Sequence, residues 1–195
     1  MKKHPIWCLA VLPFGLLTGC ATHISTTITQ NPPPAEKFSA FNRFELAKIA
    51  LPAPYAGQGG NEKARAKIQE DLSQRMDPAL KQWNSTGAAG EPARTLLIEP
   101  TISEIKFING GARFWAGALA GSSAIIMNAR ISEKETGKVI ATPMFYARAE
   151  AWGGAWTFGV TDNLMLDRIA GRLADYLLGN YGSAVGGATG AEPAS

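Results

Sequence analysis

Two segments of this chain carry apolar residues at the spacing of one helix face, and they limit its folds more than any other feature. In residues 61–83 the apolar positions recur every three or four residues between charged ones, at Ala64, Ile68, Leu72, Met76, Leu80 and Trp83. In residues 162–177 the same spacing joins Leu166, Ile169, Leu173, Tyr176 and Leu177. Each pattern predicts an amphipathic helix that must bury its apolar stripe against another element.

Four further segments have the character of strands, at residues 44–51, 96–107, 125–131 and 139–149. The alternation is clearest in 125–131, and a turn containing Gly137 joins that segment to 139–149 as a hairpin. In 96–107 the apolar residues change phase after Pro100, which predicts an edge position or a bulge.

The order of these elements is β-α-β-β-β-α. Two helices with one apolar stripe each and a sheet with one buried face predict an α+β two-layer sandwich. In this sandwich a mixed sheet carries both helices on one face. The first crossover is expected to be right-handed, with its two strands parallel.

The first 19 residues resemble a secretory signal peptide. Lys2 and Lys3 precede an apolar run over residues 6–17, which is shorter than the about 20 residues of a membrane-spanning helix. The run ends in Leu17-Thr18-Gly19-Cys20, which resembles the lipobox of bacterial lipoproteins. The resemblance implies that Cys20 receives acyl chains and holds the mature chain on a membrane. An ordinary secreted protein, cleaved at an Ala-x-Ala-like site, is the alternative.

The residue after the cysteine is Ala21 rather than Asp. In enterobacterial sorting this resembles lipoproteins of the outer membrane, so we expect the anchor at its periplasmic face rather than in the inner membrane.

Cleavage after residue 19 changes the balance of charged residues. It removes Lys2 and Lys3, so 17 basic residues remain against 16 acidic ones and the formal net charge falls from +3 to +1. A nucleic-acid partner, which needs a basic surface, is therefore not expected. Cys8 is also removed and Cys20 is lipidated, so the mature chain has no thiol for a disulfide. His23 is its only histidine, which argues against a His-dependent catalytic triad or zinc site, and the sequence indicates no cofactor.

Composition divides the mature chain into three parts. Residues 20–37 are the lipidated cysteine and a Thr- and Pro-rich stretch, which predicts a flexible tether. The 17 residues after Cys20 reach roughly 55 Å when stretched and roughly 20 to 25 Å as a coil. Residues 38–181 form a single α/β domain, and the Gly/Ala-rich residues 182–195 predict a disordered tail.

Residues 110–123 are the most unusual stretch of the chain, because they are rich in Gly and Ala around Phe114 and Trp115. A phosphate loop is disfavoured because no Gly-Lys-Ser/Thr follows. As a helix, residues 114–127 span only about 21 Å, short of the roughly 30 Å membrane core. A tight connection into the next strand and a surface for self-association or a partner remain as interpretations.

Aromatic residues gather in the loops that flank the predicted hairpin. We expect a contact patch of Arg113, Trp115, Trp152 and Trp156, because Trp and Arg are frequent anchors of protein interfaces. Rings that cap an open end of the core are the alternative interpretation.

The acidic residues have ordinary structural interpretations. Asp162 and Asp167 lie near a predicted helix start, where carboxylates cap free N–H groups and complement the helix dipole. Glu133, Lys134 and Glu135 lie in a predicted hairpin turn, so we expect them to be solvated.

Residues 94–181 resemble a family of uncharacterised bacterial lipoproteins. The stretches that carry this resemblance are Arg113 to Ser123, Glu135 to Ile140, Gly153 to Trp156 and Thr161 to Asn163. The family has no established activity and implies no catalytic residues. More loosely, the element order resembles the small α/β domains of TolB and of the curli secretion lipoprotein, which act through protein contacts.

These observations favour a non-enzymatic, periplasm-facing lipoprotein that binds another envelope protein or copies of itself. A cell-wall or lipid hydrolase with a site around Ser122, Ser123 and Asp162 is a second hypothesis. A peptidoglycan or glycan binder that uses its Trp loops is a third.

Overall fold

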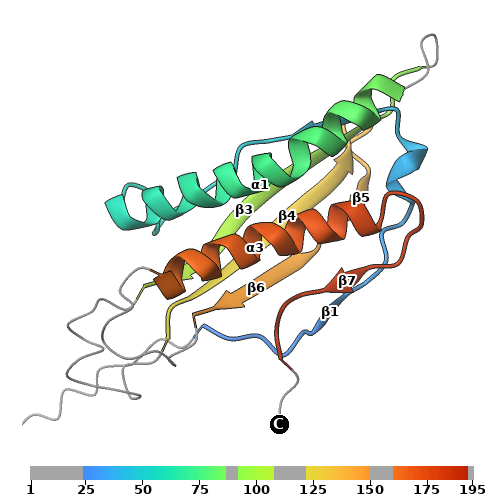
Figure 1. Ribbon diagram of the computed structural model, residues 1–195. Coiled ribbons are helices and arrows are strands. Elements are labelled where there is room, and N and C mark those ends of the chain that lie inside the picture. The colour runs from blue at the N-terminus through green and yellow to red at the C-terminus, as the bar shows by residue number, and fades with distance from the viewer. Residues whose placement is uncertain (1–23, 87–91, 108–121, 150–159, 193–195) are drawn as a thin grey trace, which may run out of the picture.

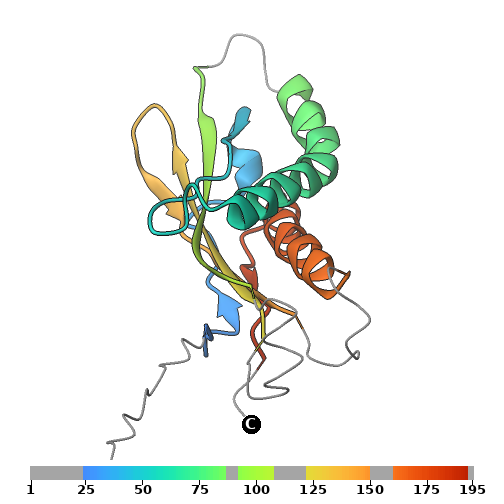
Figure 2. The same ribbon diagram turned by 90° about the vertical axis from the view of Figure 1, so that its left-hand side faces the viewer.

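The structure is a computed structural model that describes residues 24–86, 92–107, 122–149 and 160–192. Within these residues two α-helices lie side by side on one face of a five-stranded sheet, and the two layers are seen edge-on in Figure 2. The predicted α+β sandwich with both helices on one face is thus confirmed. The elements are β1 (Gln30–Asn31), the 3-10 helix η1 (Phe38–Ala40), β2 (Arg43–Leu46), α1 (Gly59–Thr86), β3 (Thr95–Lys106), β4 (Ala124–Glu133), β5 (Val139–Ala141), β6 (Met144–Arg148), α3 (Val160–Gly179) and β7 (Gly187–Ala188).

The sheet is mixed. Strands β2 and β3 pair in parallel, as the predicted crossover requires, and β4 pairs antiparallel with β3, β5 and β6. The single strand predicted over 139–149 is therefore two short strands, with Thr142 and Pro143 between them. Both pair with β4, and the Ala129 N–H reaches across the break to the Pro143 carbonyl at 2.9 Å.

The phase change in β3 has the predicted cause. The register between β3 and β4 shifts between Ile102 and Glu104, and this bulge returns Ile105 to the buried side. Pro100 is not on an edge strand, because β3 lies between β2 and β4. Its carbonyl accepts the Ala50 N–H at 2.9 Å, just beyond the end of β2.

The helices bury the stripes that their spacing predicts. Ala64, Ile68, Leu72 and Met76 of α1 are buried against the sheet, as are Leu166, Ile169, Leu173, Tyr176 and Leu177 of α3. Helix α1 continues through Pro78 to Thr86. Its last turns therefore carry Trp83 onto Tyr181, where the two rings stack 4.3 Å apart.

The two terminal segments differ from their prediction as a flexible tether and a disordered tail. Residues 24–37, here called the N-terminal strap, run along the β6 and β5 edge of the sheet (Figure 1). Strand β1 of the strap pairs with β7, and Thr189, directly after β7, accepts the Tyr146 N–H of β6 at 2.8 Å with its carbonyl. Further along, the Ala35 N–H donates to the Ile140 carbonyl at 2.9 Å.

Glycine in the C-terminal segment serves close packing. Gly186 and Gly190 have φ angles of +79° and +93°, which other residues rarely adopt. A Cβ at either position would lie 2.4 Å from a carbonyl oxygen, that of Asn31 or that of Tyr146. The glycines that suggested disorder are thus the residues that allow this segment to dock.

Asparagine side chains cover both edges of the sheet. On the β2 edge, Asn84 of α1 accepts the Phe44 N–H at 2.8 Å and donates to its carbonyl at 3.0 Å. On the other edge, Asn31 makes the same pair of bonds to Met144, at 2.8 and 2.9 Å. Each amide takes the place of a neighbouring strand and so blocks pairing with another chain.

We expect Asn84→Ala to lower the free energy of unfolding by about 1 to 2 kcal/mol, because both backbone groups of Phe44 lose their partner. It should also favour association through the opened edge. Urea unfolding and light scattering measure the two effects, with the neighbouring Ser85→Ala as the control. Identical unfolding midpoints and scattering for the two variants would contradict the role given to Asn84.

Candidate functional site

The start of the described chain is packed at one end of the sheet. At this end, here called the Ile24 end, the paired residues are Lys106, Ala124 and Arg148. Ile24 is 6% exposed and packs with Ala124, Ile126 and Tyr146 in a small cluster separate from the main core. The Tyr146 hydroxyl donates to the Ile24 carbonyl at 3.3 Å. The position of Ile24 relative to the sheet is therefore well defined.

The hydroxyl of Tyr146 stays a donor over a wide pH range. Burial of the side chain raises the pKa of this phenol above its usual value. Loss of the phenol proton at physiological pH therefore does not remove the hydrogen bond that connects Ile24 to β6.

The serines of the proposed hydrolase site lie at the same end. Ser122 Oγ accepts a hydrogen bond from Arg148 Nε. A guanidinium remains protonated in proteins and has no lone pair with which to accept a proton, so this contact does not activate a nucleophile. Ser123 is fully buried, and its carbonyl accepts the Ala149 N–H at 2.9 Å. Asp162 lies in the first turn of α3, where its charge complements the helix dipole.

The predicted lipidation and contact residues Cys20, Arg113, Trp115, Trp152 and Trp156 lie outside the described residues. The structure does describe the strands to which the segments that carry these contact residues are connected. Residues 108–121 connect the end of β3 to the start of β4, and residues 150–159 follow the end of β6. These strand ends meet where Lys106, Ala124 and Arg148 pair, so all the predicted residues belong to segments that join the Ile24 end.

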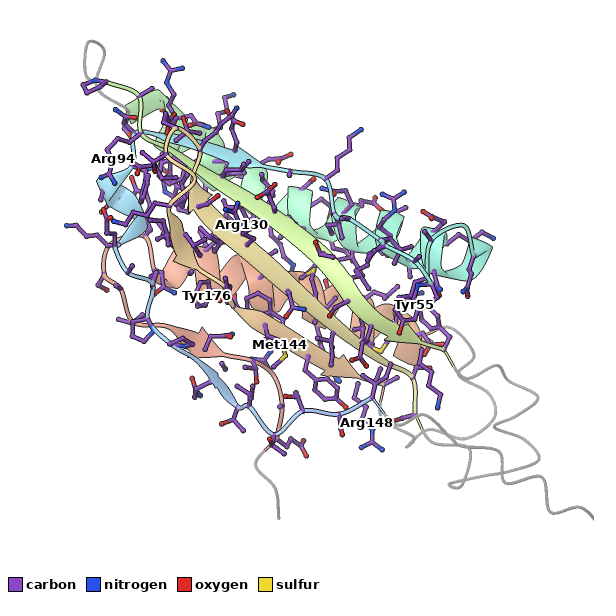
Figure 3. All side chains as sticks on the ribbon, turned by 180° about the vertical axis from the view of Figure 1, so that it is seen from behind. Tyr55, Arg94, Arg130, Met144, Arg148 and Tyr176 are labelled. Carbon is purple, nitrogen blue, oxygen red and sulfur yellow. The ribbon has the colours of Figure 1, made fainter. Side chains whose placement is uncertain are left out.

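A charged network occupies the opposite end of the sheet, as the positions of Arg94 and Arg148 in Figure 3 show. Arg94 donates from Nε to Glu133 at 2.6 Å and from Nη2 to Glu36 of the strap at 3.1 Å. Its guanidinium also lies 4.5 Å from the centre of the Phe41 ring. Lys138 completes the network with a 2.6 Å bond to Glu36. The network thus joins the strap to the residue before β3, to the end of β4 and to the β4–β5 turn.

Glu133 differs from its prediction as a solvated turn residue. It is 8% exposed, because Arg94 and the Thr136 hydroxyl both donate to its carboxylate. Those two hydrogen bonds, that from Arg94 foremost, lower the pKa of Glu133, and hydrogen bonds from Lys138 and then Arg94 lower that of Glu36. The network is consistent with a structural role.

We expect acid to weaken the fold through these carboxylates. A folded-state pKa below the ordinary 4.5 means that the stabilisation is present above that pH and is lost as the pH falls through the lowered pKa. Glu133→Gln should therefore be less stable than the natural chain at neutral pH, and its stability should fall less on acidification. Urea unfolding between neutral and strongly acidic pH measures this, and parallel stability curves for the two chains would contradict it.

Neither a metal site nor a membrane-spanning helix is found among the described residues. Within residues 24–86, 92–107, 122–149 and 160–192, no group of three or more His, Cys, Asp or Glu side chains is placed to hold a metal ion. Neither α1 nor α3 is long and apolar enough for a membrane span.

The chain matches no protein-family model and no curated protein. Among solved structures it is similar to the PelC dodecamer from Paraburkholderia phytofirmans, with 13% identity, a TM-score of 0.38 and coverage of 72% of this chain and 91% of that one. A Xanthomonas campestris protein of the DUF330 family model is 13% identical, with a TM-score of 0.40 over 81% and 93% of the two chains. A minor lipoprotein from Acinetobacter baumannii is 11% identical, with a TM-score of 0.35 over 72% and 95%. These similarities assign no family, so the resemblance to uncharacterised lipoproteins stays a prediction.

Proposed function

We propose that this protein is a lipoprotein of the bacterial cell envelope that acts by contact rather than by catalysis. The observation that carries the proposal is the run Leu17-Thr18-Gly19-Cys20 directly after an apolar segment of signal-peptide length. Acyl chains on Cys20 hold the domain on the periplasmic face of the outer membrane, as Ala21 favours. The partner is another envelope protein or a second copy of this chain.

The chemistry of the domain supports a contact role. The mature chain is nearly neutral and has a single histidine, His23. At the Ile24 end, Ser122 is bonded to a cation rather than to a base. The proposed contact patch of Arg113, Trp115, Trp152 and Trp156 lies in segments that join this same end. Large aromatic and guanidinium side chains are the residues that most often dominate the energy of protein interfaces.

Membrane fractionation tests the anchor. We expect the natural chain to sediment with outer membranes and Cys20→Ser to lose this attachment to lipid. The variant removes the thiol that the diacylglycerol requires and, because lipidation precedes cleavage, it also retains the apolar residues 6–17. Recovery of both chains in the outer-membrane fraction in equal amounts would contradict the anchor.

Crosslinking in intact cells tests the contact role. We expect the natural chain to yield a discrete species larger than the monomer, and Trp152→Ala with Trp156→Ala to reduce it. Trp83→Phe serves as the matched control, because Trp83 is buried in the main core. Recovery of monomer alone, with several crosslinker lengths, would contradict the proposal.

A further inference from the structure

We propose that the Ile24 end of the domain rests against the phospholipid headgroups of the membrane, while the Arg94 network points away from them. The inference builds on the proposed lipid at Cys20 and adds an orientation to it. It names a lipid surface as the partner of one particular end of the sheet.

The length of chain between the lipid and the first packed residue carries the inference. Only residues 21, 22 and 23 separate Cys20 from Ile24. Four residue steps span at most about 14 Å even when fully extended. Because the acyl chains of Cys20 lie in the bilayer, Ile24 is held within that distance of the lipidated residue.

Ile24 and the rest of the strap are both attached to the sheet. The Ile24 side chain is buried, and its carbonyl accepts the Tyr146 hydroxyl. Further along the strap, Asn31 makes two hydrogen bonds to Met144. Pairing of β1 with β7 adds a second attachment. Lengthening the link by releasing the strap would therefore expose buried side chains and leave backbone groups unpaired.

The opposite end of the sheet lies too far from Ile24 to contact the membrane surface at the same time. Leu97 and Glu104 are seven residues apart on β3, which corresponds to about 23 Å at about 3.3 Å per residue. Val139 of β5 pairs with Ser132, which in turn pairs with Leu97, so Val139 marks the far level of the sheet. Glu104 pairs with Ile126, at the level of the Ile24 cluster.

The outer side of α1 and the uncovered face of the sheet offer little to a bilayer. The outer side of α1 exposes Lys63, Glu70 and Lys81, and the uncovered face of the sheet carries the Arg130–Glu99 ion pair. The Ile24 end likewise has charges of both signs, at Glu104, Lys106 and Arg148. The short covalent link rather than net charge therefore determines which end meets the lipid, and the orientation should not depend on anionic lipid.

Spin labels at the two levels of the sheet test the orientation. Once Cys20 carries lipid, the mature chain has no free thiol, so Glu104→Cys and Val139→Cys each provide one labelling site. Glu104 is exposed and Val139 is 46% exposed, so both labels face solvent. The lipidated proteins are reconstituted in phosphatidylethanolamine vesicles that contain a nickel-chelating lipid. We expect the nickel at the headgroups to relax the label at 104 severalfold more than the label at 139.

A longer link is the matched control. Insertion of about 16 Gly and Ser residues after Ala21 adds a coil of about 20 to 24 Å and should remove most of the difference between the two labels. A difference that survives the insertion would overturn the short link as the cause. Equal relaxation, or stronger relaxation at 139, in the unextended chain would overturn the orientation.

Vesicle flotation separates this inference from the proposal on which it rests. Labelled protein that floats with the vesicles but shows equal relaxation at both sites overturns the orientation alone. Protein that fails to float and carries no lipid on Cys20 overturns the anchor and the orientation together. Circular dichroism and urea unfolding of both labelled variants should match the natural chain, since neither site is in the core.

Discussion

Replacement of Asn180 by alanine is expected to lower the free energy of unfolding by about 3 to 4 kcal/mol. Asn180 is fully buried at the end of α3 and organises the C-terminal segment with one side chain. Its amide nitrogen donates to the carbonyls of Tyr176 and Gly186, each at 2.8 Å. Its oxygen accepts the N–H groups of Val185 and Gly186 at 2.8 and 2.9 Å. Alanine would leave the N–H groups of Val185 and Gly186 and the Gly186 carbonyl without this partner, whereas the Tyr176 carbonyl would keep the backbone N–H of residue 180 at 3.1 Å.

Two further variants serve as comparisons for the loss of stability in Asn180→Ala. Asn180→Asp keeps an oxygen that accepts the two N–H bonds but places a second carboxylate oxygen against the carbonyls of Tyr176 and Gly186 in a buried position, so we expect a loss at least as large as that for alanine. Leu178→Ala removes a side chain that is 45% exposed and should change stability by about 0.5 kcal/mol or less. Denaturant unfolding of the three mature chains gives the comparison. A loss for Asn180→Ala no larger than that for Leu178→Ala would show that the C-terminal segment does not contribute to the fold.

Phe38→Ala is expected to cost about 3 to 5 kcal/mol, the range for removing a large buried aromatic side chain. Phe38 begins η1 directly after the strap, is fully buried, and has its ring centre 6.2 Å from that of Tyr176 on α3. Its N–H also donates to the Asn180 carbonyl at 2.9 Å. The residue thus connects the strap to the main core.

The strap itself supplies the control for Phe38. Ile28 lies in the same segment but is 56% exposed, so Ile28→Ala should change the unfolding free energy by about 0.5 kcal/mol or less. Thermal or denaturant unfolding of both variants measures the contrast. Similar small losses for the two would mean that the strap is held only loosely to the domain.

Residue spacing predicted the sandwich well because its information is local. The stripe of Ile68, Leu72 and Met76 and the alternation around Met127 each specify one buried face within a single element. Two helices and one sheet with such faces have few ways to cover one another. The phase change after Pro100 likewise indicated an edge position or a bulge in β3 from neighbouring residues alone, and the bulge is the one found.

The terminal segments were mispredicted because their partners lie far away in the sequence. Gln30 pairs with Ala188, and Asn31 binds Met144 across 113 positions. The strap and the C-terminal segment are too polar and too short for periodicity to reveal a buried face. Glycine has two uses, chain flexibility and close approach of backbones, and composition cannot distinguish them. At Gly186 and Gly190 the second use applies.

The residues of the candidate site were also predictable only where they are neighbours in the sequence. The lipobox is a run of consecutive residues, so Cys20 was predicted from the sequence directly. The Arg94 network joins Arg94 to Glu133 across 39 positions and to Glu36 across 58, and no local pattern marks those residues as partners. Glu133 in particular resembles any charged turn residue until the fold places Arg94 beside it.

Packing of the strap changes what the anchor does. A flexible tether of 17 residues would let the domain face the membrane in any orientation, whereas in the proposed arrangement a link of three residues would hold one end of the sheet close to it. The proposed lipid would then set both the place of the domain and its orientation. A partner would meet this protein at the membrane surface.

Intact-mass analysis of the protein extracted from membranes tests the anchor most directly. We expect a chain that begins at Cys20, heavier than its sequence by a diacylglycerol and one further acyl group on that residue. A chain that begins elsewhere, or one with an unmodified Cys20 thiol, would contradict the lipid anchor and with it the proposed orientation of the domain.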